Sequence, residues 1–191
     1  MTEKALPQFI HHESSPLGDI LLAADEAGLT GLWFEGQKNY ARTLSPESGE
    51  RELPVFRQAK HWLEVYFAGN EPAFSVPLHP IGTVFQQRVW NFLRTIPYGN
   101  TVTYGEIAKR LAAENGLAHL SAQAVGGAVG RNPISILIPC HRVIGADGSL
   151  IGYAGGIERK RALLTLEREG VVNAAEAIPQ AVRRRSRMRQ P

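Results

Sequence analysis

A single cysteine is the residue of this sequence best suited to nucleophilic chemistry. Cys140 follows the apolar run 134–138 and Pro139, and two potential cations, His141 and Arg142, come directly after it. Positive neighbours lower the pKa of a thiol and thereby favour the reactive thiolate. A lone cysteine is also commonly a small buried apolar residue. The residues alone therefore leave a reactive and a structural Cys140 both open.

The order of these residues restricts how the cysteine is activated. We expect residues 134–138 to form a buried strand that ends at Pro139, which makes Cys140 and His141 consecutive extended residues. Their side chains then point to opposite faces, and a direct hydrogen bond between thiol and imidazole is disfavoured. A bridging water molecule or a sharp turn at Pro139 is needed instead. An acid from elsewhere in the chain is expected to orient the imidazole.

Composition excludes several other classes of protein. One cysteine in 191 residues forms no internal disulfide and builds no cysteine-rich zinc site. The histidines show no metal-ligand spacing, so we expect no metal and no cofactor. No apolar stretch approaches the roughly 20 residues of a membrane helix, and the first residues lack the apolar segment of a secretory signal. We therefore expect a cytoplasmic protein that does not bind membranes.

The net charge of +3 comes from one end of the chain. Five arginines lie in residues 183–191, which contain no acid, and the remainder is slightly acidic. The overall charge thus identifies a basic tail rather than a nucleic-acid-binding domain. We interpret residues 171–191 as a flexible, solvated tail.

The first half of the chain has the pattern of a small sheet with one helix. Short apolar runs alternate with turn residues over 8–35, which predicts an antiparallel meander, and the polar segment 37–52 predicts a loop. Apolar residues then recur at three- and four-residue steps over 55–67, which predicts a helix that Gly69 ends. Several prolines in 70–82 indicate a linker.

The second half has the pattern of several helices. Capping boxes at Thr83–Gln86 and Thr103–Glu106 predict two helix starts, and Ser121 is placed to cap a third helix. Two short helices joined by a brief turn are typical of a helix-turn-helix, although ordinary helix pairs share this pattern. A glycine-rich loop leads to a last predicted helix over 157–169.

The sequence around Cys140 closely resembles the methylated-DNA–protein-cysteine methyltransferases, also called O6-alkylguanine-DNA alkyltransferases. The resemblance is carried by the runs FQQRVW, TIPYGNTVTYGEIA, IPCHRVIG, GYAGGIERK and LLTLE, and it extends from Thr83 to Glu169. It implies an α/β protein. Residues 1–80 form a small, ribonuclease-H-like sheet-plus-helix domain, and residues 83–170 form a mostly helical, winged-helix-like domain for DNA binding and catalysis.

The resemblance also implies a reaction and a set of site residues. The thiolate attacks the alkyl carbon on O6 of guanine, or secondarily on O4 of thymine, after the nucleotide is flipped out of the duplex. The thioether product is permanent, so each molecule acts once. The residues that match the family's catalytic positions are Cys140 as alkyl acceptor, His141 acting through water, Glu167, Asn132 and Tyr104. Those that match its base pocket or DNA contacts are Val143, Tyr153, Gly155, Gly156, Gly126 and Gly127.

Two features depart from the family pattern. Gln123 stands where many relatives have an arginine that fills the gap left by the flipped base, and it brings no charge. The turn between Tyr104 and Gln123 is a few residues longer than usual. We expect Arg131 to supply a nearby phosphate contact.

The expected partner is double-stranded DNA containing O6-alkylguanine, bound by a monomer. A lesion-binding sensor without transferase activity is an alternative, but its acceptor position would not be cysteine. A cysteine hydrolase using Cys140 and His141 is a second alternative, which the adjacency of the two residues disfavours.

Overall fold

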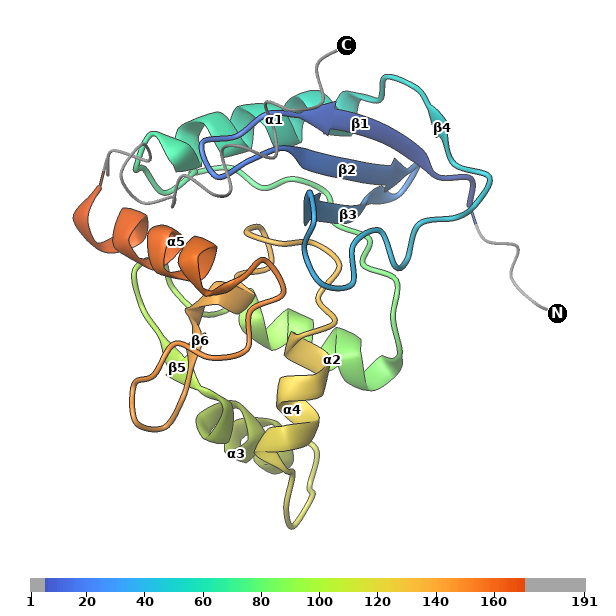
Figure 1. Ribbon diagram of the computed structural model, residues 1–191. Coiled ribbons are helices and arrows are strands. Elements are labelled where there is room, and N and C mark those ends of the chain that lie inside the picture. The colour runs from blue at the N-terminus through green and yellow to red at the C-terminus, as the bar shows by residue number, and fades with distance from the viewer. Residues whose placement is uncertain (1–5, 171–191) are drawn as a thin grey trace, which may run out of the picture.

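The computed structural model describes residues 6–170, so the predicted basic tail at 171–191 lies outside the described residues. The N-terminal half contains the predicted meander, in which each strand pairs antiparallel with the next, and a fourth short strand pairs parallel with the first. The sheet order is β3-β2-β1-β4. The strands are β1 (Phe9–Glu13), β2 (Ile20–Asp25), β3 (Gly28–Phe34) and β4 (Gly49–Glu50) (Figure 1).

The predicted helix after the sheet is α1 (Pro54–Phe67), which begins with proline at its first turn. Its buried side chains, including Phe56, Leu63 and Tyr66, belong to the same apolar core as the strand residues. Gly69 follows the helix with a φ of +84°, a left-handed conformation that suits glycine. The helix therefore covers one face of the sheet and carries Tyr66 into the interior.

The C-terminal half is mostly helical, as predicted, and the α/β class of the chain is confirmed. Both predicted capping boxes are formed, at Thr83 and Thr103, and Ser121 caps the third helix of this half. Strands β5 (Val102–Thr103) and β6 (Val143–Ile144) pair in parallel and form a two-stranded sheet. The helices are α2 (Val84–Leu93), α3 (Tyr104–Glu114), α4 (Ala122–Val129) and α5 (Ile157–Glu169).

The strand predicted at residues 134–138 is wrong. This segment folds into consecutive turns, with a bond from the Leu137 amide to the Ser135 carbonyl around Ile136, whose φ is +68°. Asn132 explains the difference, because its side chain bonds backbone groups of Ile134 and Ile138 that a sheet would otherwise use. Positive φ is rare for a β-branched residue, so this backbone conformation is held by its surroundings.

The sheet and this turn segment are joined directly. The Leu32 amide of β3 donates to the Pro133 carbonyl at 2.8 Å, and the Ser135 amide donates to the Leu32 carbonyl at 3.0 Å. Residues of both halves also belong to one continuous apolar core. The N-terminal sheet therefore positions the segment that leads to Cys140.

Within residues 6–170, no helix is both long enough and apolar enough to cross a membrane.

Candidate active site

Cys140 lies at the start of a single 3-10 turn, Cys140–Arg142, rather than in an extended segment. Its amide donates to the Ile138 carbonyl at 2.8 Å, and Pro139 between them has φ −80° and ψ 62°. These values describe an inverse γ-turn, the sharp turn at Pro139 that was one of the two expected possibilities. Cys140 is only 4% exposed. Among the described residues no hydrogen bond joins its thiol to the His141 imidazole.

Asn132 organises the backbone around the thiol. Its Nδ2 donates to the carbonyls of Ile134 and Ile138 at 3.2 and 2.8 Å, and to Cys140 Sγ at 3.1 Å. Its Oδ1 accepts the amide of Ile134 at 3.0 Å. One buried amide side chain thus fixes the turn and also offers a hydrogen-bond donor to the sulfur.

The thiol is held in its neutral form. Burial raises the pKa of Cys140 to about 11, although the Asn132 hydrogen bond and the cation of Lys160 act in the opposite direction. The prediction that the charges of Arg142 and His141 lower this pKa is therefore wrong, and His141 lowers it only through its backbone hydrogen bond. Arg142 is paired with an acid, and burial lowers the pKa of His141, which leaves the imidazole neutral.

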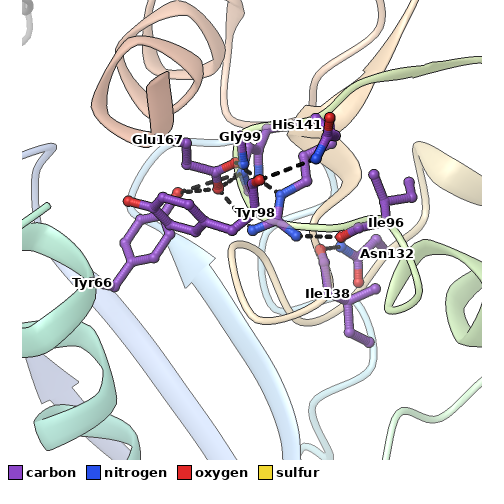
Figure 2. Close-up of polar contacts among 10 residues, drawn as sticks. Tyr66, Ile96, Tyr98, Gly99, Asn132, Ile138, His141 and Glu167 are labelled. Atoms are coloured by element: carbon purple, nitrogen blue, oxygen red, sulfur yellow. Dashed lines mark hydrogen bonds and ion pairs between the residues drawn. The ribbon is translucent and has the colours of Figure 1, made fainter. Parts of the chain in front are cut away.

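Glu167 is the centre of a buried network (Figure 2). Its carboxylate accepts hydrogen bonds from His141 Nε2 and the Tyr66 hydroxyl, both at 2.7 Å, and from the Gly99 amide at 3.1 Å. Arg142 adds two more, at 2.9 and 3.0 Å. Burial alone would raise the pKa of Glu167, but the hydrogen bonds from His141 and Arg142 and the charge of Arg142 outweigh it and hold the pKa well below its usual range. Glu167 is therefore ionised.

The ionised carboxylate determines which nitrogen of His141 carries the proton. A carboxylate only accepts hydrogen bonds, so Nε2 of His141 must be the donor. In a neutral imidazole the other nitrogen, Nδ1, then has a free lone pair. His141 Nδ1 is buried and has no hydrogen-bond partner within residues 6–170. The network thus presents one available proton acceptor, on the residue next to the thiol.

Two members of this network were missed by the sequence reasoning. Tyr66 comes from α1 in the N-terminal half, and nothing in its helical spacing distinguishes it from the other core positions. Arg142 was assigned to the thiol, but it forms a two-point ion pair with Glu167 and donates to the Ile96 carbonyl at 2.6 Å. Its proximity to Cys140 in sequence was the misleading signal.

Lys160 of α5 is a third residue that the sequence reasoning missed. Its side chain is fully buried, and its Nζ donates to the carbonyls of Val143 and Ile151, both at 2.5 Å. Burial lowers the pKa of Lys160 to about 8, and the Cys140 thiolate, when it forms, acts against that shift. Lys160 therefore connects β6 to the start of the glycine-rich loop and places a cation near the sulfur.

The loop that follows Ile151 lies against Tyr104. The Tyr104 hydroxyl is within hydrogen-bond distance of the carbonyls of Ile151 and Gly152, at 3.3 and 3.4 Å. Gly152 has a φ of +66°, and a Cβ there would lie 2.6 Å from the Tyr104 oxygen. Burial, with a smaller effect of Cys140, raises the pKa of Tyr104 to about 12, so its hydroxyl keeps its proton.

The rest of the loop packs close to the thiol. Tyr153 is buried, its ring meets that of His141 edge-on at 6.5 Å, and its pKa is raised well above its usual value, by burial first and then by Cys140. A Cβ at Gly155 would lie 2.5 Å from the Tyr153 ring. Gly156 directly precedes α5 and has a φ of +91°. The two glycines allow the loop to fold over this tyrosine.

Helix α4 lies beside the loop and presents its first turn to solvent. Gln123 is exposed there, and Gly126 is close to the Tyr104 ring, 3.7 Å from a Cβ placed on the glycine. Arg131 is exposed just after the helix and donates to the Gly127 carbonyl at 3.1 Å. The structure thus brings together Cys140 with Asn132 and His141 with Glu167, and among the described residues neither pair is hydrogen-bonded to Gln123, Gly126 or Gly127.

Comparison with known proteins assigns both halves of the chain to one family. Residues 84–169 match the family described as "6-O-methylguanine DNA methyltransferase, DNA binding domain". Residues 10–80 match "6-O-methylguanine DNA methyltransferase, ribonuclease-like domain". The match therefore also includes the N-terminal half, outside the segment that carried the resemblance in sequence.

Individual relatives agree with this result. The methylated-DNA–protein-cysteine methyltransferase of Methanosarcina acetivorans is 50% identical over 153 residues, covering 80% of this chain and 94% of its own length. The Haemophilus influenzae protein of the same name is 46% identical over 155 residues, covering 81% and 83%. The crystal structure of Mycobacterium tuberculosis OGT in complex with DNA has a TM-score of 0.75 and 44% identity, covering 88% of this chain and 98% of that one. The chain belongs to the methylated-DNA–protein-cysteine methyltransferase family.

Proposed function

We propose that this protein repairs alkylated DNA by accepting the alkyl group of O6-alkylguanine on Cys140 Sγ. The observation that carries the proposal is the buried contact between Glu167 and His141, which leaves His141 Nδ1, on the residue next to Cys140 in the chain, without a hydrogen-bond partner among the described residues. Such a nitrogen is what a neutral thiol needs in order to become a nucleophile at neutral pH.

Activation begins with the proton of Cys140. Because the pKa of Cys140 is raised to about 11, the thiol stays protonated until a base takes its proton. His141 Nδ1 accepts this proton, through a bridging water molecule, and the ionised Glu167 stabilises the imidazolium that forms. Asn132 donates a hydrogen bond to the sulfur, which stabilises the thiolate.

The displacement breaks one bond and forms another. The thiolate attacks the alkyl carbon, the sulfur–carbon bond forms, and the electrons of the carbon–oxygen bond move to the guanine. Tyr104 keeps its proton at neutral pH because its pKa is raised to about 12, so it is able to donate that proton to the leaving base. The proton on His141 then passes through solvent to the Tyr104 oxygen, which restores both residues, and the net result is a thioether and an unmodified guanine.

The product explains why each molecule acts once. A thioether has no good leaving group, and the acid–base chemistry of His141 and Glu167 does not cleave a carbon–sulfur bond. We also propose that the protein acts as a monomer. O4-alkylthymine has the same kind of alkyl–oxygen bond and is a second proposed substrate.

The alkyl group of a paired guanine is inside the base stack, so the nucleotide must leave the duplex before it reacts. The glycines of α4, Gly126 and Gly127, allow close approach of a DNA groove to this helix, and Gln123 is exposed on its first turn. The pocket for the flipped base is proposed to be formed by Val143, Tyr153, Gly155 and Gly156.

Intact mass tests the proposal. Incubation with a duplex containing one O6-methylguanine is expected to add one methyl group per protein molecule, and Cys140→Ser is expected to add none. The expected end point is stoichiometric even with excess duplex. An unchanged mass with tight binding to the methylated duplex would indicate a sensor, and an unchanged mass with repeated ester cleavage would indicate a hydrolase.

A further inference from the structure

A surface cleft of about 640 Å³ lies beside the proposed active site. One wall is formed by α4 and the residues after it, and another by the loop 152–157. The third wall comes from the N-terminal half, from residues 38–42 that follow β3. We call residues 38–42 the basic strap.

The basic strap is attached to both of the other walls. The Lys38 amide donates to the Ala154 carbonyl at 3.0 Å. Asn39 Nδ2 donates to the Gly130 carbonyl, also at 3.0 Å. Asn39 and Ala41 have φ values of +59° and +50°, conformations that these contacts help to hold. The position of the strap relative to the active-site loop is therefore fixed by bonds and not only by proximity.

All the charged side chains that line the cleft are positive. Lys38 and Arg42 from the strap and Arg131 from the end of α4 are exposed cations, and none of the described residues that line the cleft is acidic. Arg131 uses one guanidinium nitrogen on the Gly127 carbonyl and has others available. Cations around a cleft lined also by glycine backbone suit phosphate groups, which need both charge and close approach.

We infer that the basic strap binds the DNA backbone, so that the N-terminal half takes a direct part in DNA recognition. The cleft shares Gly126 and Gly127 with the exposed side of α4 and shares Gly152 and Tyr153 with the active-site loop. A phosphodiester in this cleft would therefore belong to a duplex already placed against α4. The inference rests on the proposed function in that DNA is the ligand.

The test uses the double variant Lys38→Gln/Arg42→Gln in the full chain, with an unmethylated duplex as the probe. Each lost phosphate contact lowers the slope of log K against log salt by about 0.9 and weakens binding roughly fivefold near physiological salt. For the double variant we expect the slope of log K against log salt to be smaller in magnitude by about 1–2. We expect it to bind the duplex roughly 5–25-fold more weakly. Arg57→Gln is the matched control, because Arg57 is an exposed cation on α1, away from the cleft.

A second measurement separates this inference from the proposed function. Reaction with the free nucleoside O6-methyldeoxyguanosine, followed by intact mass, is expected to proceed equally in the double variant and in the wild type, because Cys140 is not among the described residues that line the cleft. An unchanged duplex affinity and salt slope in the double variant would overturn the inference, even if methyl transfer were confirmed. Absence of methyl transfer in the wild type would overturn the proposed function, and the duplex-binding result would still decide the role of the strap.

Discussion

His141 Nε2 lies 2.7 Å from Glu167 Oε1, and both side chains are completely buried. The same carboxylate also binds Arg142 through two nitrogens. One acid therefore has two functions: it orients the proposed base and it neutralises a buried cation.

Substitution of Glu167 by glutamine is expected to impair both functions. The variant keeps the shape of the side chain but leaves Arg142 without a counter-charge, which costs about 3–5 kcal/mol for a broken buried pair. Loss of the oriented base is expected to slow methyl transfer by about 10²-fold or more. Urea unfolding and single-turnover kinetics measure the two effects. Glu169→Gln, a change at an exposed position on the same helix, is the control and is expected to alter neither the stability nor the rate. A wild-type rate of methyl transfer in Glu167→Gln would contradict the proposed role of Glu167 in orienting His141.

The raised pKa of Cys140 predicts a specific dependence of stability on pH. The thiol ionises at about pH 8.5 in an unfolded chain but at about 11 in the folded protein. Between these values the unfolded state has released its proton and the folded state has not, so the free energy of unfolding falls as pH rises. Urea unfolding at a series of pH values is expected to show a steeper fall in the wild type than in Cys140→Ser. Equal slopes would mean that burial does not raise this pKa.

Replacement of Lys160 by methionine is expected to slow methyl transfer about tenfold or more at neutral pH. The change removes a cation that lowers the pKa of Cys140 and leaves the Val143 and Ile151 carbonyls without their donor. The thiolate titration, followed by its ultraviolet absorbance, is expected to shift to higher pH. Lys60→Met on α1 is the control. If methyl transfer is slower but the Cys140 titration does not shift, Lys160 holds the loop in place and does not act on the pKa of the thiol.

Two glycine substitutions separate backbone strain from contact with Tyr104. Gly152 and Gly148 both have positive φ, at +66° and +81°, so alanine at either position is expected to cost about 1–2 kcal/mol. A Cβ at Gly152 would also meet the Tyr104 oxygen, whereas a Cβ at Gly148 would meet nothing within 4 Å. Methyl transfer is therefore expected to be much slower in Gly152→Ala than in Gly148→Ala. Equal rates would argue against a role of the Tyr104–loop contact.

Gln123→Arg is expected to tighten duplex binding. Gln123 is exposed on the first turn of α4, and an added phosphate contact there would steepen the salt slope by about 0.9. Fluorescence anisotropy at several salt concentrations measures both quantities. Gln87→Arg, an equivalent change at an exposed site on α2, is the control. If the two variants bind DNA equally, α4 does not face the duplex.

The helices were predictable because their signals are local. The capping boxes at Thr83 and Thr103 and the apolar spacing of 55–67 involve residues three or four positions apart, and all three helices form as predicted. The segment 134–138 was not predictable in the same way. Its apolar residues suit a buried strand, but the bonds made by Asn132 fold it into turns.

The residues alone suggested partners by proximity in the chain, whereas the resemblance to the family supplied residues that lie far apart in sequence, such as His141 and Glu167. The resemblance to the family identified Cys140, His141, Glu167 and Asn132, and contacts connect Cys140 to Asn132 and His141 to Glu167. The partner of Arg142 lies 25 residues away in the chain, so sequence proximity assigned this cation to the wrong group. The buried position of Lys160, likewise, is not visible in a helix whose sequence is rich in charged residues.

The pairing of β3 with Pro133 and Ser135 has a consequence for association between molecules. An open strand edge is a template on which another chain can add and aggregate. The Leu32 groups on that edge are bonded to the turn segment, and the Leu29 groups are bonded to Pro77 and His79. The bonds that hold the segment leading to Cys140 in place therefore also close this side of the sheet to intermolecular strand addition.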